Sequence, residues 1–125
     1  MKTILVIDDD INIQAVISAV LQKQGHRVFK ALNTMEAEQV LTSQTIDLIL
    51  LDIVLPGQGG LEYLMDLHNQ YPSIAVIVMS GKIRTDLIPI KKLAQQFGAL
   101  CILPKPFSAQ ELIESVSDAL NASCT

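Results

Sequence analysis

Short apolar runs alternate with longer amphipathic segments along the whole chain. The apolar runs are rich in Ile, Val and Leu and have the length of β-strands. They are Thr3–Ile7, His26–Leu32, Ile46–Leu51, Ile74–Met79 and Ala99–Leu103. Parallel strands that are covered on both faces are apolar at nearly every position, so runs such as IAVIVM favour buried parallel strands.

The segments between these runs carry hydrophobic residues at helical spacing. In the first segment they recur at steps of three and four, and Gly25 follows as a helix stop signal. The positions expected on its buried face are Ile13, Val16, Ile17, Val20 and Leu21. This pattern predicts an amphipathic helix between the first two strands.

Four further helices are indicated by start and stop signals. One opens at Asn33 or Thr34, one runs from Gly59-Gly60 to just before Pro72, one lies within Thr85–Phe97, and one opens at Ser108. Their expected apolar positions include Met35, Val40, Leu41, Leu61, Leu64, Met65, Leu67, Leu112, Ile113, Val116 and Leu120. Strand and helix therefore alternate five times, which predicts an α/β fold: a single doubly wound (βα)5 domain whose common strand order is 2-1-3-4-5.

Composition narrows the class of protein. The chain has 125 residues, half of them hydrophobic, which suits one self-sufficient domain. The net charge is −4 and the basic residues are scattered, so we expect no direct binding to nucleic acid. Neither a membrane span nor a signal peptide is visible, and Cys101 and Cys124 lack zinc-site spacing, so a cytoplasmic protein is expected.

Polar residues follow the predicted strands at their carboxyl ends. Asp8, Asp9 and Asp10 follow the first strand, Asp52 the third, Ser80 the fourth and Lys105 the fifth. With the order 2-1-3-4-5, the first and third strands are neighbours at the switch point where such folds bind ligands. We therefore expect the carboxylates to share one pocket.

Clustered carboxylates favour a hard cation such as Mg²⁺, which relieves their mutual repulsion. A carboxylate can also act as a nucleophile towards phosphorus and form an aspartyl phosphate. Asp52 is the best placed to do so, with the Lys105 charge and the Ser80 hydroxyl available to a phosphoryl group.

Four sequence segments, taken together, point to one protein family. ILVIDDD, LILLDIVLPG, VIVMSG and ILPKPF, in this order at successive strand ends, resemble the receiver domain of bacterial two-component response regulators, the CheY-like family. The resemblance spans nearly the whole chain and agrees with the flavodoxin-like fold predicted above. It implies one receiver domain over residues 1–125, with no output domain in this chain.

The resemblance also implies roles for individual residues. Asp52 matches the phosphoacceptor and Asp9 a direct metal ligand. Asp8 matches the companion that reaches Mg²⁺ mainly through water, and Val54 the residue whose backbone carbonyl completes the coordination.

On the phosphoryl side, Ser80 matches the hydroxyl residue that bonds a phosphoryl oxygen, and Lys105 the lysine that pairs with acceptor and phosphoryl group. Gly81 matches a position kept small for donor entry, and Lys105–Pro106 resembles the family's cis peptide.

The function that the resemblance implies is a phosphorylatable switch rather than an enzyme. The family accepts its phosphoryl group from a phosphohistidine on a sensor histidine kinase or a histidine phosphotransfer protein. Contacts with a downstream protein partner then relay the signal.

The chain departs from the family pattern at three places. Ile102 stands where an aromatic residue is usual, the loop LPGQGG lacks a common Asp, and the stretch between Ser80 and Lys105 is slightly long. With Ile102 in place of the aromatic residue, the sequence does not predict the aromatic rotamer switch that is usual in the family. The changed stretch between Ser80 and Lys105 favours an unusual partner or read-out.

Three other functions compete. A pseudo-receiver would keep the fold and bind partners without phosphorylation, which the absent aromatic leaves open. An aspartate-nucleophile phosphohydrolase of the haloacid-dehalogenase type would need a second carboxylate where Val54 stands. A flavodoxin-like cofactor binder would need a phosphate-cradling loop where the sequence reads DDDINIQ.

Overall fold

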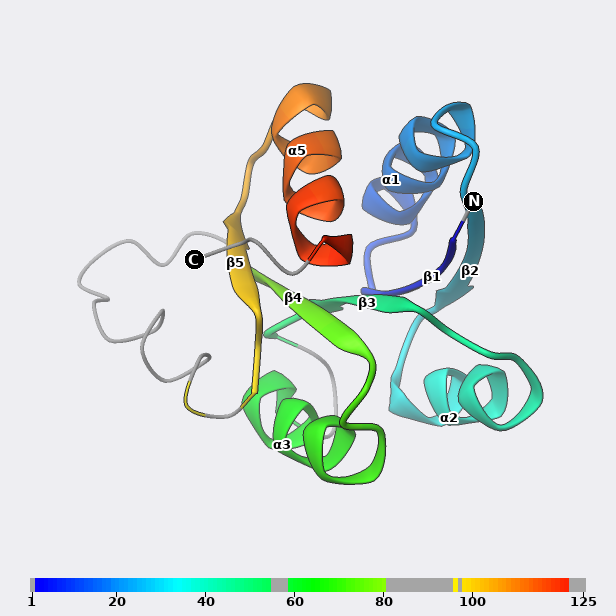
Figure 1. Cartoon of the computed structure of the whole chain (residues 1–125), viewed down its shortest axis with the longest axis vertical. Helices are drawn as coiled ribbons and strands as arrows, with labels where there is room; N and C mark the ends of the chain where they lie inside the picture. Colours follow the sequence, from blue (N-terminus) through cyan, green and yellow to red (C-terminus); the bar gives the residue numbers. More distant parts are fainter. Residues whose placement is uncertain (1, 55–58, 81–95, 97, 122–125) are drawn as a thin grey trace.

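A parallel sheet lies between two layers of helices (Figure 1). The computed structural model describes residues 2–54, 59–80, 96 and 98–121. Its strands are β1 (Thr3–Ile7), β2 (Arg27–Ala31), β3 (Leu48–Asp52), β4 (Ala75–Ser80) and β5 (Cys101–Pro104). All four strand pairs are parallel, and the order is β2-β1-β3-β4-β5. The predicted sheet and its strand order are confirmed.

The described helices cover both faces of this sheet. They are α1 (Ile11–Lys23), α2 (Thr34–Ser43), α3 (Gly60–Gln70) and α5 (Ala109–Leu120). α1 and α5 pack on one face, and α2 and α3 on the other (Figure 1). The helix predicted within Thr85–Phe97 lies, apart from Gln96, outside the described residues. None of the described helices combines the length and hydropathy that a membrane span requires.

Alternating side chains of each strand supply two separate hydrophobic cores. Leu5 and Ile7 of β1 face α2 and α3, whereas Ile4 and Val6 face α1 and α5. Burying a Leu or Ile side chain completely stabilises the fold by about 1.5–3 kcal/mol. The residues of β3 from Leu48 to Leu51 are fully buried as well, so β1 and β3 hold their carboxyl ends rigidly side by side.

The strand ends differ slightly from those predicted. β3 begins later and includes Asp52, because Asp47 is held in front of it: the Asp47 carboxylate accepts the Thr3 N–H at 2.8 Å. β2 is one residue shorter at each end, and β4 and β5 begin at Ala75 and Cys101.

Side-chain caps fix where three helices begin. Asp10 accepts the backbone N–H groups of Asn12 and Ile13, and Ser108 and Glu111 form a reciprocal capping box at the start of α5. Asn33 caps α2, but the Glu36 carboxylate accepts the Leu32 N–H rather than that of the cap residue. Such caps contribute about 1 kcal/mol each.

A close backbone approach positions α3. The Gly60 N–H donates to the Ile53 carbonyl at 3.0 Å, and a Cβ at Gly60 would lie only 2.2 Å from that oxygen. Glycine is therefore required where the chain turns back after β3.

The buried face of α1 overlaps the predicted one but is shifted towards Gln14 and Ser18. Of the predicted residues, Ile17 and Leu21 are fully buried, and Ile13 and Val20 are partly buried against the same core. Its buried residues are Gln14, Ile17, Ser18 and Leu21, whereas Val16 is 59% exposed. The spacing i, i+3, i+4, i+7 is satisfied by both sets, and the structure selects the one that gives buried Gln14 a partner. Met35 on α2 and Met65 on α3, also expected to be apolar contacts, are 70% and 41% exposed.

Candidate functional site

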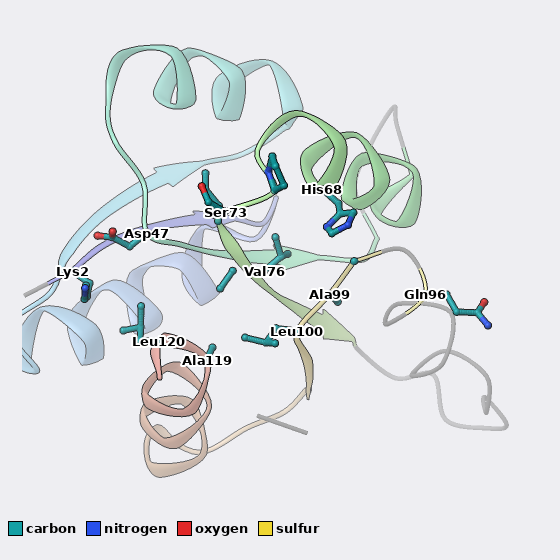
Figure 2. A pocket seen from close by; sticks show the side chains of 14 residues that line it. Lys2, Asp47, His68, Ser73, Val76, Gln96, Ala99, Leu100, Ala119 and Leu120 are labelled. Atoms are coloured by element: carbon teal, nitrogen blue, oxygen red, sulfur yellow. The ribbon is translucent and has the colours of Figure 1, made fainter. Parts of the chain in front are cut away.

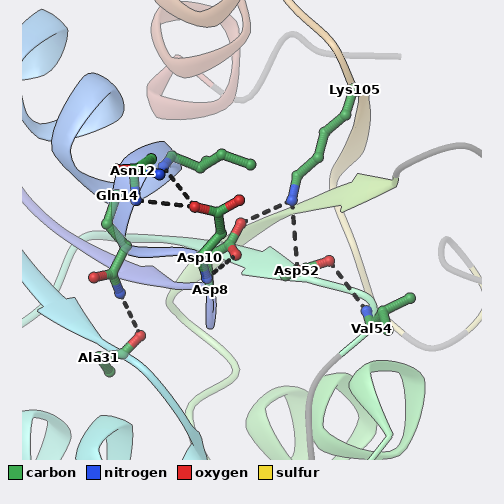
Figure 3. Close-up of polar contacts among 9 residues, drawn as sticks. Asp8, Asp10, Asn12, Gln14, Ala31, Asp52, Val54 and Lys105 are labelled. Carbon is green, nitrogen blue, oxygen red and sulfur yellow. Dashed lines mark hydrogen bonds and ion pairs between the residues drawn. The ribbon is translucent and has the colours of Figure 1, made fainter.

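The site lies at the edge of the sheet where the strands end. Asp8 follows β1, Asp52 ends β3, Ser80 ends β4 and Lys105 follows β5. Because β1 and β3 pair directly, Asp8 and Asp52 lie beside each other, and Lys105 reaches over both (Figure 3). The structure thus brings together residues that are far apart in the sequence.

Asp8 is a fully buried carboxylate held from two sides. Its exposed fraction is 0%, and its Oδ1 accepts the backbone N–H of Asp10 at 2.9 Å. Its Oδ2 accepts a hydrogen bond from the Lys105 ammonium at 2.8 Å. A buried charge needs such partners, so Asp8 depends on Lys105.

Asp52 is 6% exposed, and its negative charge has weaker hydrogen-bond and ion-pair partners than that of Asp8. Its Oδ1 accepts the Val54 N–H at 3.1 Å, while its Oδ2 lies 3.5 Å from the Lys105 Nζ. Burial raises the pKa of the Asp52 carboxyl above its usual range, and the Asp8 carboxylate adds to this rise. The Val54 N–H and the Lys105 charge oppose it without cancelling it.

Lys105 is the shared countercharge of the two aspartates. Burial by itself lowers the pKa of the Lys105 ammonium, but the hydrogen bond to Asp8 and the charges of Asp52 and Asp8 outweigh it. The net effect raises the pKa of Lys105 above its ordinary value, so the side chain stays charged throughout the neutral range.

Three carboxylates can hold a cation at this edge. One oxygen from each of Asp8, Asp9 and Asp52 lies within 4.8 Å of the others, and Asp9 is exposed to solvent. Among the described residues, three carboxylates face one lysine here, and oxygen donors of this kind suit a hard divalent ion. The donor set therefore fits the Mg²⁺ expected from the sequence.

For the remaining predicted site residues the structure gives fewer contacts. Val54 follows β3 and is 67% exposed, and its N–H is turned towards Asp52. Ser80 accepts the Lys105 N–H with its backbone carbonyl at 2.8 Å, and Gly81 lies outside the described residues. The Lys105–Pro106 peptide bond is cis, as the family resemblance implies. Ile102 is partly buried and packs against the core under α2 and α3.

One polar contact beside the site escaped the sequence analysis. Gln14 of α1 is buried, and its side-chain amide donates to the Ala31 carbonyl at 2.6 Å (Figure 3). The available signal was a glutamine beside Ile13 and one helical turn before Ile17, both predicted apolar positions.

A cavity of about 600 Å³ lies at the opposite, amino-terminal edge of the sheet (Figure 2). Lys2, Asp47, His68 and Ser73 are its polar lining residues nearest the strand starts. The Asp47 carboxylate is already bonded to the Thr3 N–H, and none of the aspartates of the acidic cluster lines this cavity. The volume of this cavity therefore does not mark the functional site, which lies at the opposite edge of the sheet.

A family comparison decides what kind of site this is. The response regulator receiver domain model matches residues 4–117. The chain belongs to the response regulator receiver family. Receiver domains are regulatory modules of two-component systems, and the acidic edge of this receiver corresponds to the end of the sheet where the four sequence segments meet.

Two relatives illustrate the range of proteins that contain such a domain. The receiver is 33% identical over 119 residues to sporulation initiation phosphotransferase F of Bacillus subtilis (strain 168), covering 95% of this chain and 94% of that protein. It is 37% identical over 120 residues to the DNA-binding transcriptional regulator NtrC of Azospirillum brasilense, covering 96% of this chain but 24% of that protein.

Solved structures agree with this assignment. A response regulator receiver domain protein from Clostridium thermocellum superposes with a TM-score of 0.86 at 32% identity, covering 97% of this chain and 95% of that one. The receiver domain of NtrX from Brucella abortus gives a TM-score of 0.86 at 31% identity, covering 94% and 98%. Family membership and fold are therefore supported independently.

Proposed function

We propose that this receiver is a phosphorylatable signalling switch in which Asp52 accepts a phosphoryl group from a phosphohistidine. The donor is a sensor histidine kinase or a histidine phosphotransfer protein, and the output is a contact with a downstream protein. The domain is a regulatory phosphoacceptor that assists its own phosphorylation, not an enzyme acting on a separate substrate.

One observation carries the proposal: buried Asp52 lies beside a second buried carboxylate, Asp8, and the Lys105 side chain reaches both. In the transfer, an Asp52 oxygen forms a bond to phosphorus while the bond from phosphorus to the donor imidazole nitrogen breaks. That nitrogen keeps the electron pair and takes up a proton. Lys105 can pair with the negative charge that the phosphoryl group adds, since its Nζ is 3.5 Å from the Asp52 Oδ2.

The proposed metal ligands are Asp9, Asp52 and the Val54 carbonyl, with Asp8 acting through water. When bound, Mg²⁺ supplies positive charge to the phosphoryl oxygens. The acidic cluster supports this assignment, because in the part of the chain that the structure describes its three carboxylates have Lys105 alone as countercharge. Ser80, at the end of β4, is the proposed hydroxyl donor to the phosphoryl group.

Intact-mass spectrometry tests the proposal. The protein is incubated with Mg²⁺ and a small acyl phosphate, with wild type beside Asp52→Asn. We expect wild type alone to gain about 80 Da, the mass of one phosphoryl group replacing a proton. The Asp52→Asn variant keeps the Val54 hydrogen bond but loses the nucleophile.

The alternatives give other results. If neither protein gains mass and Mg²⁺ does not bind, a pseudo-receiver that binds partners without phosphorylation replaces the proposal. If both gain mass equally, the acceptor is another residue. Steady release of inorganic phosphate from many equivalents of substrate would favour a phosphohydrolase, which the apolar Val54 side chain argues against.

The apolar start of α1 is the proposed docking surface for the phosphohistidine donor. Ile11 follows the capping Asp10 and is 65% exposed, and Val16 lies further along the same helix at 59% exposed. α1 carries no acidic residue and a single basic residue, Lys23. An apolar, nearly uncharged helix beside the acceptor suits a contact with another helix.

We expect Ile11→Ala to slow phosphoryl transfer from the donor protein about tenfold, the effect of losing one well-buried interface contact. Transfer from acyl phosphate should not change, because Ile11 is not among the polar residues of the site. Radiolabel transfer assays with the two donors separate these effects.

Met35→Ala is the matched control, since Met35 is equally exposed but lies on α2, across the sheet. Equal slowing by both variants, or slowing with acyl phosphate as well, would contradict docking at α1.

A further inference from the structure

We infer that Gln14 is a positioning residue for the metal-binding carboxylates. It is 4% exposed, although it is a polar residue on a helix that packs against an apolar sheet. Burying an amide without a partner is unfavourable, so the contact that Gln14 makes decides whether this burial is tolerated. Its side-chain Nε2 donates to the backbone carbonyl of Ala31, the last residue of β2, at 2.6 Å.

The Ala31 carbonyl is also the acceptor for Asp8. The Asp8 backbone N–H donates to the same oxygen at 3.1 Å, so one carbonyl ties β2, α1 and the acidic turn together. A carbonyl oxygen has two lone pairs, and both hydrogen bonds are therefore compatible. Figure 3 shows Gln14 reaching down to Ala31 from the helix that begins just after the acidic turn.

The consequence of this link lies in the direction of the Asp8 carboxylate. Asp8 occupies the point where the chain leaves β1 and turns towards α1, and its Oδ1 accepts the Asp10 N–H at 2.9 Å. Gln14 holds the other side of that turn, because its own N–H donates to the Asp10 carbonyl at 3.0 Å. The turn from Asp8 to Asp10 is thus held by the Asp8 and Asp10 side chains and by Gln14, whose side chain adds the link to the Ala31 carbonyl.

Residues behind the ligands commonly tune metal sites. Hydrogen-bond partners that orient ligands change metal affinity by about 10–100-fold when they are removed. Gln14 acts one step further back: it shares the Ala31 carbonyl with the Asp8 backbone N–H and does not contact the Asp8 carboxylate. The inference rests on the proposed Mg²⁺ site, and it adds a determinant that lies outside the acidic cluster.

The experiment is a Mg²⁺ titration of Gln14→Met, followed through the backbone amide signals of Asp9 and Val54 by NMR. The chain has no tryptophan, so an intrinsic tryptophan signal is not available. Methionine keeps the length of the side chain and removes the donor. We expect its Mg²⁺ dissociation constant to rise about tenfold relative to wild type.

Ser18→Ala is the matched control. Ser18 is also a buried polar residue on the same face of α1, one turn further from the acidic turn. A dissociation constant within about twofold of wild type is expected for this variant, since it leaves the Ala31 link intact. Gln14→Glu adds a second check, because it keeps the shape but replaces the donor with an acceptor, and it should not restore the wild-type arrangement of the turn.

The outcomes distinguish a failure of the positioning role of Gln14 from a failure of the proposed Mg²⁺ site. If wild type binds Mg²⁺ and Gln14→Met binds it equally well, the positioning role is wrong and the proposed function stands. Equal weakening by Ser18→Ala and Gln14→Met would also overturn it, by showing a general effect of disturbing α1. If wild type itself does not bind Mg²⁺, the proposed metal site and the role of Gln14 fail together.

Discussion

We expect Lys105→Met to lower the free energy of unfolding by about 3 kcal/mol in metal-free buffer, because it leaves a buried charge unpaired. Asp8 is 0% exposed and receives a hydrogen bond from Lys105 at 2.8 Å. Asp52 loses its nearest cation at the same time. For a domain of this length the loss corresponds to about 10 °C in melting temperature.

Mg²⁺ should reverse much of this loss. A divalent ion bound by the same carboxylates supplies the missing positive charge and binds only the folded state. The increase in melting temperature on adding Mg²⁺ should therefore be larger for Lys105→Met than for wild type. Thermal unfolding followed by circular dichroism, with and without Mg²⁺, measures both effects.

The pH dependence of the lysine contribution follows from its raised pKa. Stability from a group whose pKa is raised on folding is present below the unfolded pKa and is lost as the pH rises through the folded value. For Lys105 both values lie at or above the ordinary 10.5, so the contribution should be constant across the neutral range.

Lys30→Met is the control for this variant, since Lys30 is exposed on β2 and should change stability by no more than about 0.5 kcal/mol. A Lys105→Met protein that melts with wild type in metal-free buffer would refute the dependence of Asp8 on Lys105.

The second expected result is a gain in stability. Asp52→Asn should raise the free energy of unfolding by about 2 kcal/mol near neutral pH without metal. The variant no longer buries a negative charge at position 52, and it removes the repulsion between that charge and the Asp8 carboxylate. Asparagine has nearly the same shape, and its side-chain oxygen can still accept the Val54 N–H. Lys105 then serves Asp8 alone.

Acid should remove this gain. The pKa of Asp52 is raised on folding, so the native state binds more protons than the unfolded state between the two pKa values. Wild-type stability therefore falls as the pH rises through that window, and below the unfolded pKa of about 3.9 the carboxyl is neutral in both states. The difference between Asp52→Asn and wild type should shrink from neutral pH towards about pH 4.

Urea unfolding at several pH values measures that difference. Asp10→Asn is the matched control, because Asp10 is exposed and asparagine caps a helix about as well as aspartate. An Asp52→Asn protein less stable than wild type at neutral pH would contradict crowding as the dominant effect at Asp52.

Local patterns were sufficient to predict the sheet and most helix starts. Apolar runs of strand length, alternating with helical spacing, leave few ways to bury every run other than a doubly wound sheet. The helix starts at Asn33 and Ser108 were visible for the same reason, since a cap acts within a few residues of itself. The start of β3 was less accurate because Asp47 pairs with Thr3, a contact between residues far apart in the sequence.

The position of the site was also predictable. Asp8, Asp9, Asp52 and Lys105 each follow a predicted strand, and parallel strands place their carboxyl ends at one edge. Their roles remain predictions until phosphorylation and Mg²⁺ binding are measured.

The sequence by itself therefore determined the strand order, the helix caps and the edge at which the polar residues gather, because these depend on local pattern and chain connectivity. Only the tertiary structure decided which face of α1 is buried and how the charges are shared. Val16 fits the helical period but is 59% exposed, whereas Gln14 is buried with its side-chain amide bonded to the Ala31 carbonyl at the end of β2. In the same way, Lys105 lies nearer to Asp8 than to Asp52 because of distances set by packing, which no spacing along the chain encodes.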